Sequence, residues 1–164
     1  TEELEKNGYR RAGYDHFVKN DDYLSKEIDE GTMAWNRLGI VSGSYINVLG
    51  VGVNTSCLLS NNLYYQNYFE NEKYEESIDM GQLPISNHHV ISNEDYMRGE
   101  LIQTIRNYFR LDKKNFSKKY NINFNKYFKK NLKNLADYEK DNLLKNDENF
   151  IELTTLGRSK RTTT

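Results

Sequence analysis

The sequence is poor in cysteine, in proline and in long apolar runs. Cys57 is the only cysteine of the 164 residues, which excludes an internal disulfide. No segment approaches the roughly 18 apolar residues of a transmembrane helix, and no apolar stretch near Thr1 resembles a signal peptide. The net charge of −1 gives no overall field that would attract nucleic acid or anionic lipid. We therefore expect a cytoplasmic protein that has no membrane partner.

Aromatic residues compensate for a low hydrophobic content. Hydrophobic residues make up 37% of the chain, below the usual share of a globular protein. However, 13% of the residues are aromatic, and 13 of them are tyrosines, which bury a ring while the hydroxyl stays in water. The composition predicts a folded domain with a thin core. Because the chain begins in a charged segment, we expect it to be a piece of a longer protein.

Glycines and capping residues predict the elements of the first half. Asp21 or Asp22 is placed to cap a helix that ends before Gly31, on which Leu24 and Ile28 share one face. Glycine-interrupted apolar residues between Thr32 and Leu59 predict short strands and tight turns. The remaining predictions are a helix Glu2–Lys6 that ends at Gly8, an extended piece Tyr9–Val18 and a helix Phe69–Met80.

The second half has the order of a winged helix. Ser92 and Asp95 have the spacing of a capping box, which predicts that a helix begins there. The predictions that follow are one helical face with Met97, Leu101, Ile105 and Tyr108, a short helix Phe116–Tyr120, a longer helix Asn125–Lys140 burying Phe128, Leu132 and Leu135, and a strand Phe150–Leu153. The predicted fold is α+β, mainly helical with a small antiparallel sheet and a winged-helix-like end. We expect two segments, 1–90 and 91–164.

Residue types alone identify no catalytic residue and no metal site. His16, His88 and His89 lack cysteine partners at ligand spacing, so structural or surface roles are expected for the last two. Cys57 lies in an apolar stretch, as a small core residue would. Gly50 and Gly52 form a Gly-x-Gly without a third glycine, which is weak evidence for phosphate binding.

A lysine cluster leaves DNA binding as an alternative. A winged helix with a basic helix binds DNA by neutralising phosphates. Arginine, the usual reader of guanine, is absent between Lys113 and Lys145, and solvated helix faces explain lysines more simply, so we do not expect nucleic acid as a partner. The cluster comprises Lys113, Lys114, Lys118, Lys119, Lys126, Lys129, Lys130 and Lys133.

Several short motifs occur in an order that resembles a known family. They are Gly13-Tyr14-Asp15-His16-Phe17, Asp21-Asp22-Tyr23-Leu24, Asn36 three residues before Gly39, Leu49-Gly50-Val51-Gly52-Val53, Tyr64-Tyr65-Gln66-Asn67, Gly81-Gln82-Leu83-Pro84, Glu94-Asp95, Arg98, Leu111-Asp112 and Thr154-Thr155-Leu156-Gly157-Arg158. Each is weak alone, and their joint order is fairly specific. From about residue 7 to 161 the chain resembles the part of the oxygen-independent coproporphyrinogen III oxidases that follows the radical-SAM barrel.

The resemblance implies an enzyme whose cofactors lie elsewhere. In that family the barrel carries a Cys-x3-Cys-x2-Cys motif for a [4Fe-4S] cluster, and S-adenosyl-L-methionine (SAM) binds the remaining iron. The reaction is the oxidative decarboxylation of coproporphyrinogen III to protoporphyrinogen IX in haem biosynthesis. With one cysteine this chain cannot hold the cluster. We therefore expect no catalytic residue here, no activity of the chain alone, and a barrel partner in the same or a separate chain.

The resemblance also gives candidate pocket residues: Asn36, Arg37, Gly50 and Gly52. Arg37-Leu38 and Ser56 depart from the Phe-Gln and Ile that the family has in segments linked to a second SAM, and Arg37 is placed to meet a substrate carboxylate. One alternative is a radical-SAM haem chaperone or haem-degrading relative, although the chaperones resemble Glu-Ile-Ser-Asn-Phe where this chain has Asp15-His16-Phe17. Another is a stand-alone module that binds a separate barrel chain.

Overall fold

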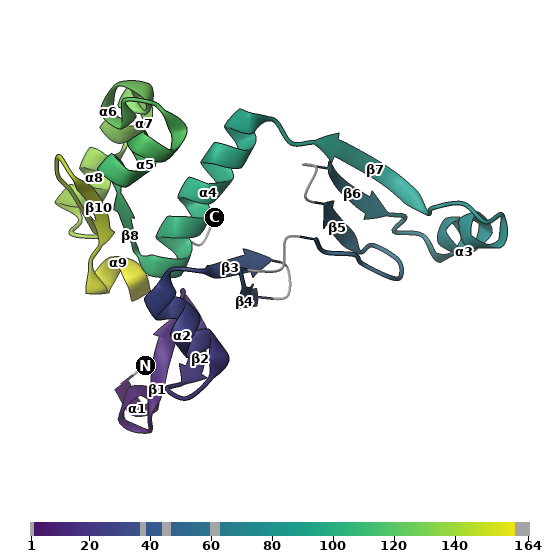
Figure 1. The fold of residues 1–164 in the computed structure, drawn as a ribbon, viewed down its shortest axis with the longest axis horizontal. Coiled ribbons are helices and arrows are strands. Elements are labelled where there is room, and N and C mark those ends of the chain that lie inside the picture. The colour runs from purple at the N-terminus through teal and green to yellow at the C-terminus, as the bar shows by residue number, and fades with distance from the viewer. Residues whose placement is uncertain (1, 37–38, 44–46, 60–62, 160–164) are drawn as a thin grey trace. The chain divides into compact units, whose positions relative to one another are not determined.

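The chain is divided into two compact units. The structure, a computed structural model, describes residues 2–36, 39–43, 47–59 and 63–159. The first unit comprises residues 1–42 and 99–164, and the second comprises residues 43–98 (Figure 1). The predicted division of the chain at residue 90 into two contiguous segments stays a prediction.

Two small hairpins and two helices begin the first unit. The elements are α1 (Glu2–Lys6), β1 (Tyr9–Ala12), β2 (His16–Lys19), α2 (Tyr23–Glu30), β3 (Met33–Asn36) and β4 (Gly39–Ser42). Strand β1 pairs antiparallel with β2, and β3 with β4. The Asp22 side chain accepts a hydrogen bond from the Leu24 amide at 2.8 Å, and Gly31 ends α2 in the left-handed conformation, so both predicted caps are confirmed.

The core of this unit lies where the hairpins meet α2 and α4 (Asn93–Tyr108). Ala12, Val18, Met33 and Ile40 are buried together, and Leu24, Ile28, Trp35 and Tyr108 pack against them. The predicted inward face of α2 is therefore confirmed. A buried polar contact joins α2 to β4, since the Ser42 hydroxyl donates to the Glu27 carboxylate at 2.6 Å.

The rest of the first unit has winged-helix topology. After α4 come β8 (Arg110–Asp112), α5 (Lys113–Tyr120), α6 (Phe124–Tyr127), α7 (Lys129–Lys133), α8 (Leu135–Lys140), β9 (Leu144–Asn146), β10 (Phe150–Leu153) and α9 (Thr155–Ser159). Strand β10 lies between β8 and β9 in an antiparallel sheet. The predicted strand Phe150–Leu153 and the α+β class are confirmed, whereas sequence reasoning missed β8.

The predicted helix Asn125–Lys140 is wrong, because the structure divides it into α6, α7 and α8. Phe128 ends α6 with φ −94° and ψ 17°, outside the helical range. Its ring is buried against Phe116 and Phe124, with ring centroids 6.3 and 4.8 Å away. Packing of Phe128 into this aromatic cluster therefore accompanies the break in the helix.

The second unit is a three-stranded antiparallel sheet with one helix. Its elements are β5 (Ser56–Leu59), β6 (Leu63–Asn67), α3 (Asn71–Asp79) and β7 (Ile85–Val90), in the strand order β5-β6-β7.

The predicted capping box at the start of α4 is confirmed: the Ser92 hydroxyl accepts from the Asp95 amide at 3.1 Å, and the Asp95 carboxylate accepts from the Ser92 amide at 3.3 Å.

Candidate functional site

Side chains of α4 hold β3 in place. The Met33 amide donates to the Tyr108 hydroxyl at 2.7 Å, and the Asn107 amide donates to the Met33 carbonyl at 3.1 Å. Gln103 accepts from the Trp35 amide at 3.1 Å and donates to the Trp35 carbonyl at 2.9 Å. These bonds satisfy backbone groups that a strand of a two-stranded ribbon would otherwise leave unpaired. Helix α4 thereby positions the end of β3, where the candidate residues begin.

Asp15 and His16 form a carboxylate–imidazole pair at the turn into β2. The Nδ1 atom of His16 lies 2.8 Å from an Asp15 carboxylate oxygen. The Nε2 edge of the ring faces Gly39 of β4: a Cβ added to Gly39 would be 2.3 Å from the His16 Nε2 atom and 3.0 Å or more from the carbons beside it. Any side chain at Gly39 would displace the imidazole. The close approach explains why a glycine with φ of +123° stands there.

Asn36 lies on the face of the β3–β4 hairpin that points away from the core. Asn36 is directly opposite Gly39, and directly opposite residues of an antiparallel pair point to the same face. The next pair, Trp35 and Ile40, packs with the core of the unit and so faces the other way. The candidate Arg37 lies outside the described residues.

Gly50 and Gly52 belong to a loop of the second unit that is stabilised from within. The Gly50 amide donates to the Cys57 sulfur and the Gly52 amide to the Tyr74 hydroxyl, both at 3.0 Å. The Asn67 side chain donates to the Gly52 carbonyl at 3.0 Å. A Cβ on Gly50 would be 2.6 Å from the Thr55 Cβ. Close packing accounts for Gly50, and internal partners occupy both glycine amides, which an anion would otherwise use. Cys57 is buried, as predicted.

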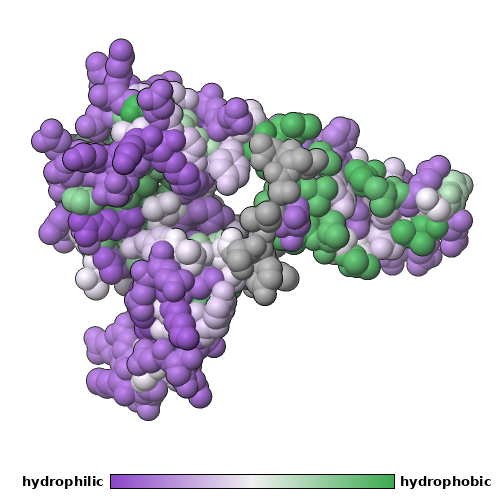
Figure 2. All heavy atoms as spheres, viewed as in Figure 1, coloured by the Kyte–Doolittle hydropathy of each residue, from purple (hydrophilic) through white to green (hydrophobic). Residues whose placement is uncertain are grey.

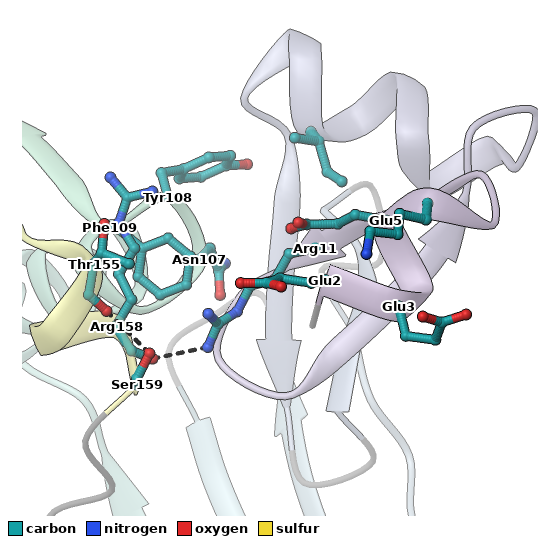
Figure 3. A pocket seen from close by; sticks show the side chains of 12 residues that line it. Glu2, Glu3, Glu5, Arg11, Asn107, Tyr108, Phe109, Thr155, Arg158 and Ser159 are labelled. Carbon is teal, nitrogen blue, oxygen red and sulfur yellow. Dashed lines mark hydrogen bonds between the residues drawn. The ribbon is translucent and has the colours of Figure 1, made fainter.

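A pocket of the first unit is lined by α1, the end of α4 and α9 (Figure 3). The guanidinium groups of its two arginines both contact the Phe109 ring. The guanidinium carbon is 5.3 Å from the ring centroid in Arg11 and 5.1 Å in Arg158. Arg11 donates to three backbone carbonyls, those of Gly13, Tyr14 and Arg158. Arg158 donates to the Leu153 carbonyl at 3.1 Å. The two arginines of this pocket are thus engaged in holding the fold.

The Thr154–Arg158 motif clamps α9 to the end of α8. The Thr154 hydroxyl donates to the Asn142 carbonyl at 2.6 Å and accepts from the Gly157 amide at 3.0 Å. A Cβ on Gly157 would lie 1.9 Å from the Leu143 carbonyl oxygen, which is far inside any allowed contact. The glycine of the motif is therefore required by packing, and the motif is structural.

The second unit exposes much of its apolar content (Figure 2). Among its described residues, the buried apolar side chains are Cys57, Pro84 and Met97. Val51 is 89% exposed and Leu83 75%, values at which a side chain gains almost nothing from the protein interior. We define the apolar surface as the exposed aliphatic, methionine and phenylalanine side chains of this unit. They are Leu49, Val51, Val53, Leu58, Phe69, Ile78, Met80, Leu83 and Val90.

The lysine cluster of the winged-helix part is not a uniform basic face. Lys113 is buried, and its ammonium group donates to the Asn146 side chain at 2.7 Å and to the Asp147 carbonyl. Burial lowers the pKa of Lys113. Lys119 forms an ion pair with Glu100 at 2.6 Å. The basic helix predicted over Asn125–Lys140 is divided into α6, α7 and α8. It therefore does not form a continuous recognition helix for DNA.

Within the described ranges, no three His, Cys, Asp or Glu side chains are grouped as a metal ion would require. In the same residues, no helix is both long enough and apolar enough to span a membrane. A cluster bound by three thiolates would need two more cysteines than the chain has. The residues present therefore do not fit an iron–sulfur cluster.

Comparison with known proteins identifies the family. Residues 91–159 match the family model of the HemN C-terminal domain. The oxygen-independent coproporphyrinogen III oxidase of Helicobacter pylori strain J99 is 33% identical over 154 residues, and that of Escherichia coli K12 is 31% identical over 155 residues. The chain belongs to the oxygen-independent coproporphyrinogen III oxidase family, as a counterpart of its C-terminal part. The resemblance found in the sequence is confirmed.

The match covers nearly all of this chain and a minor part of its relatives. In both alignments it covers 94% of this chain and 34% of the relative, so the chain spans about a third of the length of these oxidases. A solved structure, described as coproporphyrinogen III oxidase (HemN) from Escherichia coli, a radical SAM enzyme, has a TM-score of 0.87 at 30% identity. It covers 96% of this chain and 36% of that one.

Two features of the site were missed from the sequence. The contact between His16 and Gly39 brings together two motifs that the sequence places far apart, and no local signal predicts it. The exposure of Leu49, Val51 and Val53 is the second, because glycines among aliphatic residues predict short strands and tight turns there.

Proposed function

We propose that the chain acts as the C-terminal domain of an oxygen-independent coproporphyrinogen III oxidase, and that it contributes to the oxidative decarboxylation of coproporphyrinogen III only beside a radical-SAM barrel. The observation that carries the proposal is the similarity to these oxidases along 94% of the chain, supported by the TM-score of 0.87. The proposed setting is the cytoplasm.

The cofactors are assigned to the barrel. When bound there, the [4Fe-4S] cluster and SAM would supply the radical that begins the reaction. This chain has a single, buried cysteine, so we propose no catalytic residue in it and no activity of the chain alone. The pocket candidates Asn36, Arg37, Gly50 and Gly52 stay proposals. Arg37 remains the proposed contact for a substrate carboxylate.

The apolar surface supports a barrel as partner. A unit with three buried apolar side chains in its described part gains little hydrophobic stabilisation by itself, and large exposed apolar areas mark interaction sites. In the relatives, about two thirds of the protein lies beyond the matched part. We propose that the apolar surface packs against the barrel, which is supplied by the same or a separate chain.

A reconstitution experiment tests the function. The barrel half of the Helicobacter pylori relative is produced separately, its cluster is reconstituted without oxygen, and the 164-residue chain is added with SAM, a reductant and coproporphyrinogen III. We expect decarboxylation in the mixture and none from the chain alone. Absence of both a complex and product, with a native relative as positive control, would refute the proposed function.

A surface variant tests the contact. Leu49→Asp together with Val51→Asp puts charge on two exposed positions that do not support the fold, so folding should be preserved. The variant should bind the barrel at least about tenfold more weakly, because two apolar contacts are replaced by desolvated charges. Ile102→Asp, at an apolar position of α4 that is also exposed, is the control. Equal weakening by both variants would contradict an interface at the apolar surface.

A further inference from the structure

Arg106 of α4 is a half-buried cation that stacks on an aromatic ring. Its guanidinium carbon lies 3.5 Å from the centroid of the Trp35 ring, and both residues belong to the first unit. A stacked guanidinium group uses its face, so its five N–H donors, which lie in its plane, stay available for hydrogen bonds. Among the described residues, none forms a hydrogen bond or an ion pair with the Arg106 side chain.

Arg106 differs in this respect from the other arginines that the structure describes. Four of them donate to oxygen atoms of the protein: Arg10, Arg11, Arg98 and Arg158. Arg110 is stacked in the same way as Arg106, 3.9 Å from the centroid of the Phe150 ring, but it is exposed, so water solvates its charge. Arg106 is partly withdrawn from water, where a charge interacts more strongly with an opposite charge.

The guanidinium nitrogens of Arg106 can be reached from solvent. In the part of the chain that the structure describes, Oδ1 of Asn107 is the one buried side-chain nitrogen or oxygen without a hydrogen-bond partner. The guanidinium nitrogens of Arg106 also lack such partners, so they are not buried. The aliphatic part of the side chain accounts for its burial, and the charged end lies at the surface. A ligand therefore has access to these donors.

Helix α4 fixes both members of the stack. The side chain of Gln103 accepts from the Trp35 amide at 3.1 Å and donates to the Trp35 carbonyl at 2.9 Å. Arg106 follows three residues later on the same helix, a spacing that places it beside Gln103. The guanidinium group is thus held before a ligand arrives, which lowers the entropic cost of binding. Because Trp35 immediately precedes the pocket candidate Asn36, the stack lies where the candidate residues begin.

We propose that Arg106, stacked on Trp35, binds a carboxylate group of the ligand as a bidentate ion pair. The planar guanidinium group matches the two oxygen atoms of a carboxylate, and such charge-assisted pairs are about twice as strong as neutral hydrogen bonds. The inference rests on the proposed function, under which the ligand is a tetrapyrrole with four propionate carboxylates. Arg106 is a binding residue here and takes no part in the chemical step.

A binding titration of the 164-residue chain tests the inference. Coproporphyrin III, the stable oxidised form of the proposed substrate, is titrated and followed by its own absorption. Its tetramethyl ester, in which no carboxylate remains, is titrated in the same dilute detergent. We expect the wild type to bind the acid at least about tenfold more tightly than the ester, as loss of a hydrogen bond to a charged group predicts.

Variants separate recognition from structure. Arg106→Gln should weaken binding of the acid about tenfold and leave the affinity for the ester unchanged. Arg106→Lys keeps the charge but loses the planar fork, so its affinity for the acid should lie between those of the wild type and Arg106→Gln. Arg110→Gln is the matched control, because it removes the same charge from another stacked arginine of the same unit. It should retain the wild-type affinities.

The carboxylate of SAM is a second source of the same chemistry, so SAM alone is titrated against the wild type and Arg106→Gln. SAM binding that depends on Arg106, with equal affinities for acid and ester, would assign the arginine to SAM and overturn the tetrapyrrole site. An Arg106→Gln chain that binds the acid as the wild type does would also overturn it. So would equal losses for acid and ester, because Arg106 would then only support the fold.

These outcomes are distinguishable from failure of the proposed function, because the titration does not require decarboxylation. A clear preference for the acid that depends on Arg106, beside an inactive barrel mixture, would leave the site standing and remove the oxidase assignment. An active barrel mixture with a chain that shows no such preference would remove the site alone.

Discussion

Replacement of Gly157 by alanine should destabilise the first unit strongly. The added Cβ would be 1.9 Å from the Leu143 carbonyl oxygen and 2.9 Å from its carbonyl carbon, whereas real Cβ atoms hardly ever come closer than 3.0 Å to another atom. The obstacle is backbone, which cannot rotate away as a side chain would. Helix α9 and the segment at Leu143 must therefore separate by roughly 1 Å, a strain of the kind that overpacking causes.

Separation endangers three hydrogen bonds. The Thr154 amide donates to the Leu143 carbonyl at 3.0 Å, and the Thr154 hydroxyl donates to the Leu143 and Asn142 carbonyls at 3.2 and 2.6 Å. Each such bond contributes about 1 kcal/mol, and overpacking costs about 1–3 kcal/mol. We expect the free energy of unfolding to fall by about 2–4 kcal/mol. For a chain of this length the unfolding temperature should fall by roughly 5–15 °C.

Fluorescence of Trp35 provides the assay, because Trp35 and Gly157 belong to the same unit. Urea unfolding followed at this tryptophan compares the wild type with Gly157→Ala. Gly99→Ala is the control: Gly99 lies inside α4, and nothing is within 4 Å of its added Cβ. It should stabilise the unit by about 0.5–1 kcal/mol. A Gly157→Ala chain as stable as the wild type would refute the argument from packing.

Two further predictions concern the same end of the chain. Thr154→Val should lower the free energy of unfolding by about 1–2 kcal/mol, because it removes the hydroxyl that caps Gly157 and bonds to Asn142, while Thr155→Val at the exposed neighbour should change it little. Hydrogen bonds from the Phe150 and Asn149 amides lower the pKa of Asp147 below its ordinary value. The ionised carboxylate therefore stabilises the fold above the ordinary pKa of aspartate, and the contribution is lost as the pH falls through the lowered value. Urea unfolding measured between pH 7 and pH 2 should show that the free energy of unfolding falls less on acidification in Asp147→Asn than in the wild type. An identical pH profile would contradict a stabilising role of the ionised Asp147.

Sequence patterns predicted the elements whose signals are local. The caps at Asp22 and Ser92 were predictable because a side-chain oxygen and a nearby amide are the whole of the interaction. The break at Phe128 was not, because it serves packing against Phe116, which is distant in the sequence. Strand β8 was missed because three residues make a strand only once β10 lies beside them.

The site shows the same limit. The resemblance brought attention to Asp15 and His16 as part of a motif, and it gave Asn36 as a pocket candidate. The packing of His16 on Gly39, which lies opposite Asn36, is a tertiary contact without a local signal. Likewise the Leu49–Val53 segment has the pattern of short strands and tight turns, but it lies outside the strands and exposes its three aliphatic side chains. Composition cannot tell burial within a unit from burial against a partner.

The inserted position of the second unit has a consequence for synthesis on the ribosome. The first unit is built from residues 1–42 and 99–164, so its hairpin β3–β4 is made well before the α4 side chains that hold it. Domains made in one continuous stretch can fold as they emerge. Here residues 1–42 lack the hydrogen bonds from α4 until residues 43–98, which carry the whole apolar surface, have been synthesised. Newly made chains are thus most exposed to aggregation at that interval, and slowing translation there would prolong it.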